Sequence, residues 1–347
     1  MESTSGYPCW PFVWFYVVVK IVWNLGIGLK CPVKYHVFYL PTPSLSVCPM
    51  GSGASRLYSS LAQTLVNNST TTTPLAHHQD PQHPSQALGE GMDSFVNCPL
   101  EALNWILTYR PHILCLQEVD HYYDTFQPIL ASLGYRSNFC PKPWSPCLDV
   151  EGNNGPDGCA LVNVRLCAVL IPTNQVCKLR CRVTGRRLCV AVTHLKARSG
   201  WERLRSAQGS DLLRNLTTLT QSPGGPSGPI GIAPDTPLLV CGDFNAVPSE
   251  DVYQRFASSP LILDSAYKRL SRDGLSEPAY TTWKIRPTGE CCTTLDYIWY
   301  SREAFRVDAV LDMPTEEQIG PNRLPSYNYP SDHLSLVCDF SFKKEEE

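Results

Sequence analysis

The sequence predicts an α/β fold from about residue 86 onward, and three observations support this prediction. Short apolar runs of strand length recur along the chain, and several of them end on a charged or polar residue. Residues 201–216 repeat apolar side chains at helical spacing. The 347-residue chain is 43% hydrophobic and 18% charged, which is typical of a folded core rather than of a disordered chain.

Five apolar runs are predicted as buried strands because they are too short for helices. They are residues 112–117, 188–193, 238–241, 295–300 and 334–340. Taken one at a time, a polar residue at a strand end is usually a turn or cap residue. Several strands side by side would instead bring such residues together in one pocket at the rim of a sheet. The residues concerned are Glu118, His194, Asp243, Asn245, Asp296, Asp332 and His333. Oxygen ligands with imidazoles and no thiolate indicate Mg²⁺ and phosphoester hydrolysis.

The N-terminal quarter differs in composition from the rest. We expect residues 1–49 to form an apolar leader, residues 50–85 a disordered linker and residues 86–347 the catalytic domain. The apolar run at residues 10–29 has the length of a membrane span, but Lys20 lies in its middle. We therefore favour an unstructured or wrongly predicted leader over a membrane anchor.

The charge of the chain is nearly balanced, with a formal net charge of −3. This excludes a generally cationic nucleic-acid binder. Residues 165–205 nevertheless hold ten basic residues against one acid, which indicates a discrete anionic ligand. Within this segment, the basic side chains of residues 180–187 are expected to lie on a solvent-exposed surface without a ligand. Lys196 and Arg198 alternate with His194, so all three would share one side of a strand.

The sixteen cysteines are scattered along the chain without zinc-site spacing, and we expect most of them to be reduced, buried side chains. The sequence also contains neither a dinucleotide-binding glycine motif nor a P-loop.

Five motifs in this order resemble the endonuclease/exonuclease/phosphatase family. They are LQEVD at 116–120, THLK at 193–196, GDFNA at 242–246, LDY at 295–297 and SDH at 331–333. The resemblance covers roughly residues 86–342, with a further stretch at 50–65. It implies a four-layer α/β sandwich of two mixed β-sheets packed face to face and flanked by helices. The implied chemistry is Mg²⁺-dependent attack of water on phosphorus.

The resemblance also implies roles for the residues of these motifs. Glu118 would be the principal Mg²⁺ ligand, with Asp332 assisting the metal or lying behind it. Asp243 would orient and deprotonate the attacking water, and Asn245 would hold a phosphate oxygen beside it.

Two histidines complete the implied catalytic set. Asp296 would pair with His333 and fix its tautomer, so that the imidazole stabilises charge on the phosphoryl oxygens. His194 would contact the same phosphate or the leaving oxygen. The basic residues matching those around the substrate phosphates are Lys142, Lys196, Arg198 and Arg286.

Longer matching stretches are similar to one branch of the family, related to the nucleases that shorten poly(A). The activity implied by this branch is removal of the 2′-phosphate from NADP⁺ and NADPH, giving NAD⁺ and NADH. The alternative in the same class is a poly(A)-specific 3′-exoribonuclease, with RNA as the partner. A cytoplasmic protein is expected, with mitochondria as the alternative location.

Three stretches are shorter than the family pattern. Residues 80–85 stand where the family has an asparagine-bearing strand, and residues 101–111 are too short for the helix expected there. Residues 157–161 lead directly into residues 162–166, where a strand's worth of chain is expected between them. These gaps predict a variant or faulty gene model that lacks three core segments and has reduced activity. The alternative hypothesis is a catalytically impaired chain that acts at most as a binding protein.

Overall fold

The structure is a computed structural model that describes part of the chain. The described residues are 15–22, 106, 108–149, 155–164, 167–172, 176–182, 184–220, 236–326, 328–329 and 331–343. The expected linker at 50–85 and the stretch 80–85 lie outside the described residues, as do most of the leader and most of the short segment 101–111.

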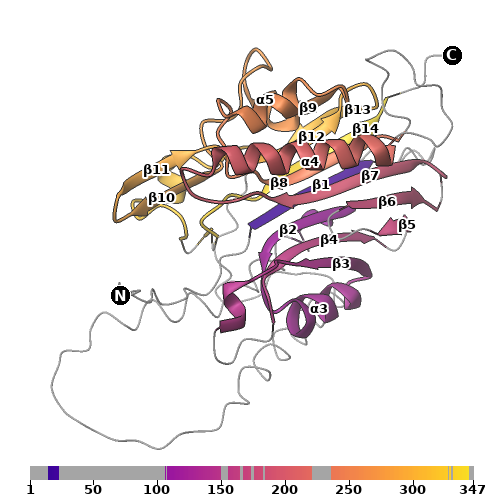
Figure 1. The fold of residues 1–347 in the computed structure, drawn as a ribbon, viewed down its shortest axis with the longest axis horizontal. Coiled ribbons are helices and arrows are strands. Elements are labelled where there is room, and N and C mark those ends of the chain that lie inside the picture. The colour runs from indigo at the N-terminus through magenta and orange to yellow at the C-terminus, as the bar shows by residue number, and fades with distance from the viewer. Residues whose placement is uncertain are drawn as a thin grey trace, which may run out of the picture. The chain divides into compact units, whose positions relative to one another are not determined.

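The described part of the chain forms two six-stranded sheets and a separate hairpin (Figure 1). The first sheet has, in spatial order, β13 (Phe305–Val310), β14 (Leu336–Phe342), β1 (Phe15–Val22), β2 (Ile113–Val119), β4 (Gly158–Val164) and β3 (Tyr135–Pro141). The second sheet has β5 (Cys167–Pro172), β6 (Val176–Cys181), β7 (Arg187–His194), β8 (Leu238–Asp243), β12 (Asp296–Ser301) and β9 (Leu263–Ser265). The hairpin pairs β10 (Thr282–Arg286) with β11 (Gly289–Thr293).

The two sheets pack face to face, and alternate residues of their strands enter two different cores. In β7, Val190 and Val192 lie in the core between the sheets, whereas Cys189 and Ala191 lie in a second core under the helices. This strand is buried on both faces, which explains why it is a continuous apolar run rather than an alternating one. β7 and β8 are parallel and their other neighbours are antiparallel, so the sheet is mixed.

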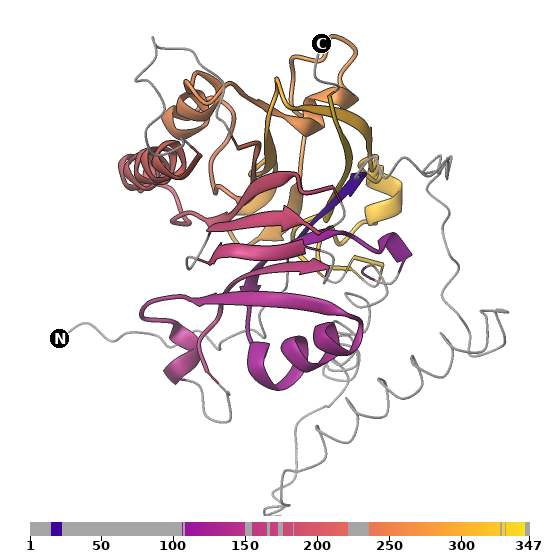
Figure 2. The same ribbon diagram turned by 90° about the vertical axis from the view of Figure 1, so that its right-hand side faces the viewer.

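Helices pack on the outer face of the second sheet and beside the edge strand β3 of the first sheet (Figure 2). α4 (Glu202–Thr220) and α5 (Asp251–Ala257) pack on the second sheet, and α3 (Gln127–Ser132) lies on the side of the first. A short α6 (Glu316–Ile319) follows β13 and begins with a capping box. This arrangement confirms the predicted four-layer α/β sandwich, including the five apolar runs as strands and the segment 201–216 as a helix.

The free cysteines agree with the sequence-based expectation. The eleven cysteines whose side chains the structure describes are all free, and eight of them are buried. None of the described helices is long and apolar enough to cross a membrane.

β1 corrects the expectation of an unstructured leader. It lies inside the first sheet, parallel to β14 and antiparallel to β2, so the interior of this sheet has no empty position. Its direction is defined by the register, in which Phe15 pairs with Gln117 and Val22 pairs with Ser341. The N-terminal end of β1 therefore lies beside Glu118, and its C-terminal end lies at the opposite end of the strands, next to Ser341.

The chain is also continuous where residues 157–161 lead into residues 162–166, the place at which a strand's worth of chain was expected to be absent. β4 runs without interruption across residues 161 and 162, pairing with β2 on one side and with β3 on the other.

Candidate active site

Strand register brings three predicted site residues together at one edge of the second sheet. His194 ends β7 and pairs with Asp243, the last residue of the parallel strand β8. Asp243 in turn pairs with Asp296, the first residue of the antiparallel strand β12. Asp243 and Asp296 are both buried, at 6% and 1% exposure. Ends of neighbouring strands thus converge as the sequence predicts.

His333 joins this group from the segment before β14. Its Nδ1 lies 2.9 Å from Asp296 Oδ2, so the buried carboxylate fixes the orientation of the ring. Burial alone lowers the pKa of His333, but the negative charges of Asp296 and Asp243 outweigh it and raise the pKa to about 10. The protonated form of the imidazole is therefore favoured, and the contact of its Nδ1 with Asp296 is the pairing expected from the sequence.

Asp243 is a buried carboxylate that lies beside a second buried carboxylate, Asp296. Burial and the neighbouring Asp296 raise the pKa of Asp243 to about 6. Asn245 orients it, donating from its backbone N–H to Oδ1 at 2.7 Å and from Nδ2 to Oδ2 at 3.1 Å. His194 Nε2 lies 3.6 Å from Asp243 Oδ2, and burial lowers the pKa of His194, which keeps this imidazole neutral.

Glu118 and Asp332 approach the same site from the first sheet and from the segment before β14. Glu118 Oε1 lies 3.8 Å from His194 Nε2, and Glu118 has the left-handed φ of +51°, a conformation uncommon outside glycine. Burial and the charge of Asp332 raise the pKa of Glu118. Asp332 accepts a hydrogen bond from Lys284 Nζ at 2.6 Å and one from Arg286 Nη2 at 3.2 Å.

The donor set of this site fits a hard divalent cation. Carboxylate oxygens of Asp243 and Asp296 lie within 4.8 Å of each other and of a ring nitrogen of His333. The buried Oδ1 of Asp296 has no hydrogen-bond partner among the described residues. Glu118 and Asp332 add two more carboxylates at the rim, and a cation would offset the mutual repulsion of these groups.

The predicted substrate-binding cations fall into two groups. Arg286 and Lys142 lie at the site, because Arg286 contacts Asp332 and the charge of Lys142 acts on both Glu118 and His194. Lys196 and Arg198 lie in the loop between β7 and α4 and are exposed. Lys196 Nζ lies 5.3 Å from the ring centroid of Trp201, a cation–π contact.

Lys284 is a site residue that the sequence analysis did not identify. Its Nζ lies 3.2 Å from His333 Nε2 in addition to its contact with Asp332. The available signal was strand alternation, because Lys284 precedes Arg286 by two residues on β10 and shares its face. Thr281, fully buried, likewise donates from its hydroxyl to Asp296.

One basic residue of the segment 165–205 is not part of an exposed positive surface. Arg205 on α4 is 2% exposed and forms an ion pair with Glu250, with Nη2 2.8 Å from Oε2. Its Nη1 also donates to the backbone carbonyls of Lys196 and Arg198 at 3.1 and 2.7 Å. Arg205 therefore fastens the loop that carries these two cations.

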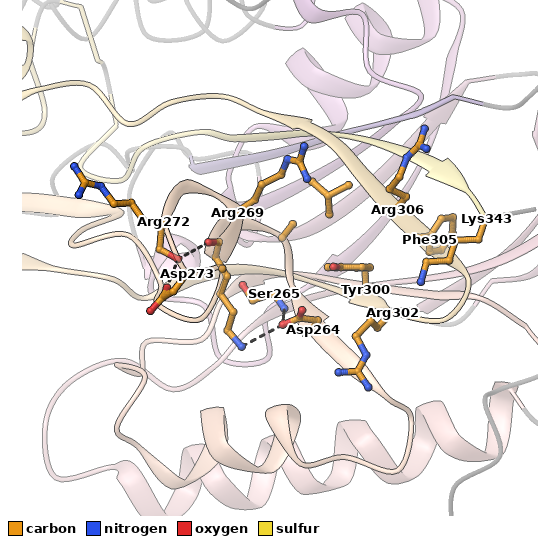
Figure 3. A pocket seen from close by; sticks show the side chains of 15 residues that line it. Asp264, Ser265, Arg269, Arg272, Asp273, Tyr300, Arg302, Phe305, Arg306 and Lys343 are labelled. Atoms are coloured by element: carbon orange, nitrogen blue, oxygen red, sulfur yellow. Dashed lines mark hydrogen bonds and ion pairs between the residues drawn. The ribbon is translucent and has the colours of Figure 1, made fainter.

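A second concave region lies away from the carboxylates of the candidate active site, at the end of β12 that carries Tyr300 (Figure 3). It has a cavity volume of about 530 Å³. The basic residues that line it are Lys268, Arg269, Arg272, Arg302, Arg306 and Lys343. None of the predicted site residues borders it, so it is separate from the candidate active site.

Comparison with known proteins agrees with this geometry. Residues 202–333 match the model of the Endonuclease/Exonuclease/phosphatase family. Nocturnin from Homo sapiens is 52% identical, covering 88% of this chain and 85% of the human protein, and nocturnin from Xenopus laevis is 52% identical with 87% and 94% covered. The human alignment runs over 379 residues, more than the 347 of this chain, so the relative has segments that this chain lacks.

Solved structures show the same fold. The human nocturnin catalytic domain with bound sulfate anion is 54% identical, with a TM-score of 0.59, and the match covers 71% of this chain and 86% of that one. ANGEL2, described as a 2′,3′-cyclic phosphatase, is 23% identical with a TM-score of 0.56 and shares the fold. With half of its residues identical over most of the length of its relatives, the chain belongs to the nocturnin family within the endonuclease/exonuclease/phosphatase hydrolases.

Proposed function

We propose that this chain is a Mg²⁺-dependent phosphatase that removes the 2′-phosphate from NADP⁺ and NADPH. The observation that carries the proposal is the contact between Lys284 Nζ and His333 Nε2, which lie 3.2 Å apart beside the carboxylates of the site. The negative charges of Asp296 and Asp243 raise the pKa of His333, so the imidazole and the ammonium group of Lys284 together favour an anion at this point. A phosphoryl oxygen has the charge to accept hydrogen bonds from both side chains.

The residues at the site divide the work of hydrolysis. Asp243, oriented by Asn245, takes a proton from the attacking water, whose oxygen forms a new bond to phosphorus. The bond between phosphorus and the ribose 2′-oxygen breaks, the leaving oxygen takes a proton from solvent, and Asp243 later releases to solvent the proton that it took from the water. His333 and Lys284 hold the phosphoryl oxygens, and His194 lies near the leaving oxygen.

Glu118 and Asp332 would hold the Mg²⁺. When bound, this ion supplies positive charge that offsets the charge developing on the phosphoryl group. Asp332 is suited to ligation because its pKa is low: burial acts to raise it, but His333 and the two cations of β10 outweigh that effect.

A small dinucleotide suits the site better than a long RNA. Lys142, Lys284 and Arg286 gather around one point rather than along a track. A phosphomonoester next to a diphosphate presents several charges within such a compact region. The nuclease alternative is supported by a more distant relative, the CCR4-Not complex 3′-5′-exoribonuclease subunit Ccr4 of Coccidioides immitis (strain RS), which is 26% identical.

The test is phosphate release from NADPH by the purified 347-residue chain with and without Mg²⁺. Glu118→Ala is expected to reduce the rate by more than about 100-fold, because removal of even an outer partner of a metal ligand costs about 10- to 100-fold. Glu303→Ala, which removes an exposed carboxylate distant from the site, is the matched control and should keep the full rate.

Each other outcome identifies a different function. Shortening of oligoadenylate with no release from NADPH would favour the exoribonuclease. A folded chain inactive on both substrates would favour the impaired binding protein, as the missing segments suggest.

A further inference from the structure

Trp144 is the most exposed large hydrophobic side chain of the described residues. It is 95% exposed, and it has the left-handed φ of +57°, which is unfavourable for a bulky residue. No aromatic ring or cation among the described residues contacts its indole. The backbone at Trp144 thus adopts an unfavourable conformation while the side chain is exposed to solvent.

The loop that carries Trp144 is held firmly at its base. Asp157, 1% exposed, accepts a hydrogen bond from the Ser145 hydroxyl, and Ser145 Oγ accepts from the backbone N–H of Asp157 at 3.0 Å. The backbone N–H of Lys142 donates to the Asp157 carbonyl at 2.8 Å. Because both flanks are fixed, the indole is presented in a defined position.

The register of the first sheet places this loop beside the active site. Gly158 of β4 pairs with Val119, the residue after Glu118, and on its other side with Pro141, the residue before Lys142. Neighbouring strands are about 4.8 Å apart, so the start of the loop lies about 10 Å from the strand end that carries Glu118. Lys142 Nζ contacts Asp157 Oδ2 at 3.3 Å and remains 42% exposed.

We propose that Trp144 is the stacking platform for the adenine of the phosphorylated ribose, and that it determines specificity for a nucleoside over a base-free phosphomonoester. This inference deepens the proposed function and rests on it. The base and the 2′-phosphate are attached to adjacent carbons of one ribose. Once the phosphate occupies the site, the adenine lies near its rim, where a rigid indole offers a flat face and Lys142 a charge for the diphosphate.

Kinetics of Trp144→Ala and Trp144→Phe test this role. Trp144→Ala is expected to raise KM about tenfold for NADPH and for adenosine 2′-monophosphate with kcat changed less than twofold, since base stacking contributes to binding. Trp144→Phe keeps a stacking ring and should stay within about threefold of the parent. For glycerol 2-phosphate, which has no base, both variants should equal the parent. Leu275→Ala, which truncates another exposed apolar side chain (74% exposed), is the matched control.

The result for adenosine 2′-monophosphate identifies the base. An unchanged KM for this substrate in Trp144→Ala would overturn the assignment to adenine, and an equal loss on glycerol 2-phosphate would overturn stacking altogether.

A binding measurement separates this inference from failure of the proposed reaction. Calorimetric titration of adenosine 2′-monophosphate into Glu118→Ala, with and without Trp144→Ala, needs no turnover. A Kd about tenfold weaker in the double variant supports the platform even if the chain hydrolyses nothing. Equal affinity overturns it.

Discussion

Asp243 is a buried carboxylate whose ionisation is opposed by its surroundings. Burial and the adjacent Asp296 raise its pKa to about 6, whereas the neighbouring histidines act in the opposite direction. A proton acceptor with a pKa just below neutrality is suited to take a proton from water at neutral pH. The same residue is therefore expected to set the acidic limit of activity.

The pH dependence follows from the direction of this shift. Asp243 accepts a proton only when ionised, which is above its pKa, so kcat/KM should fall about tenfold per pH unit as the pH drops through that value. Bound Mg²⁺ favours the ionised form, so the limb should lie at or below about pH 6. His194 adds no limb near neutrality because burial lowers its pKa. The rate on NADPH between pH 4.5 and 8, with circular dichroism as the control for folding, is the measurement. Activity that rises toward acid would contradict the role.

The residues of the site were predictable from sequence to different degrees. His194, Asp243 and Asp296 each stand at the end of an apolar run, and their strands proved to be neighbours. Lys284 does not end an apolar run, and its alternation with Arg286 showed only that the two share a face of β10. Its contact with His333 depends on how the β10–β11 hairpin folds back, with Thr282 bridging to His333. Such contacts between distant segments leave no pattern in local sequence.

At the scale of elements, α4 positions the loop that carries two predicted substrate cations. Arg205 is nearly completely buried and joins the helix to Glu250 and to the carbonyls of residues 196 and 198. The apolar spacing of residues 201–216 predicted the helix. The excess of basic residues in the segment 165–205, in contrast, placed Arg205 among the cations that would attract an anionic ligand. The partner Glu250 lies 45 positions further along the chain, beyond any periodicity.

Arg205→Ala is expected to lower the free energy of unfolding by about 1.5–3 kcal/mol, since it removes a buried guanidinium that donates hydrogen bonds to the partly buried Glu250 and to two loop carbonyls. It should also raise KM for NADPH, because the loop carbonyls lose their anchor. Arg203→Ala, exposed on the same helix, is the matched control and should change stability by less than about 0.5 kcal/mol. Urea denaturation measures the difference, and equal stability of the two variants would contradict the anchoring role.

At the scale of the whole molecule, the N-terminal strand completes the first sheet. The run FYVVVKIV is strand-like in its β-branched content, but a 20-residue apolar segment around it favoured a leader. Its partners β2 and β14 lie far along the chain, so no local pattern indicated the pairing. The sequence could therefore predict the class of fold and most of its strands, but not which segment fills the middle of the sheet.

Val18→Pro tests whether this strand supports the fold. Val18 pairs with Val337 on one side and Leu114 on the other, so its N–H faces a neighbouring strand. Proline removes that donor and should lower the free energy of unfolding by about 2 kcal/mol or more. Val18→Ile, which keeps a β-branched apolar side chain and the backbone N–H, should remain within about 1.5 kcal/mol of the parent. Identical denaturation midpoints for the two variants would show that the sheet does not depend on β1.

The pairing of β1 with β14 has a consequence for biosynthesis. Val17 is paired with Leu336 and Val22 with Ser341, so the first sheet joins a segment made early in translation to one made late. Until β14 leaves the ribosome, β1 presents an unpaired edge, and neighbouring nascent chains could pair with it. Slow, non-local closure of this kind favours protection by chaperones during synthesis.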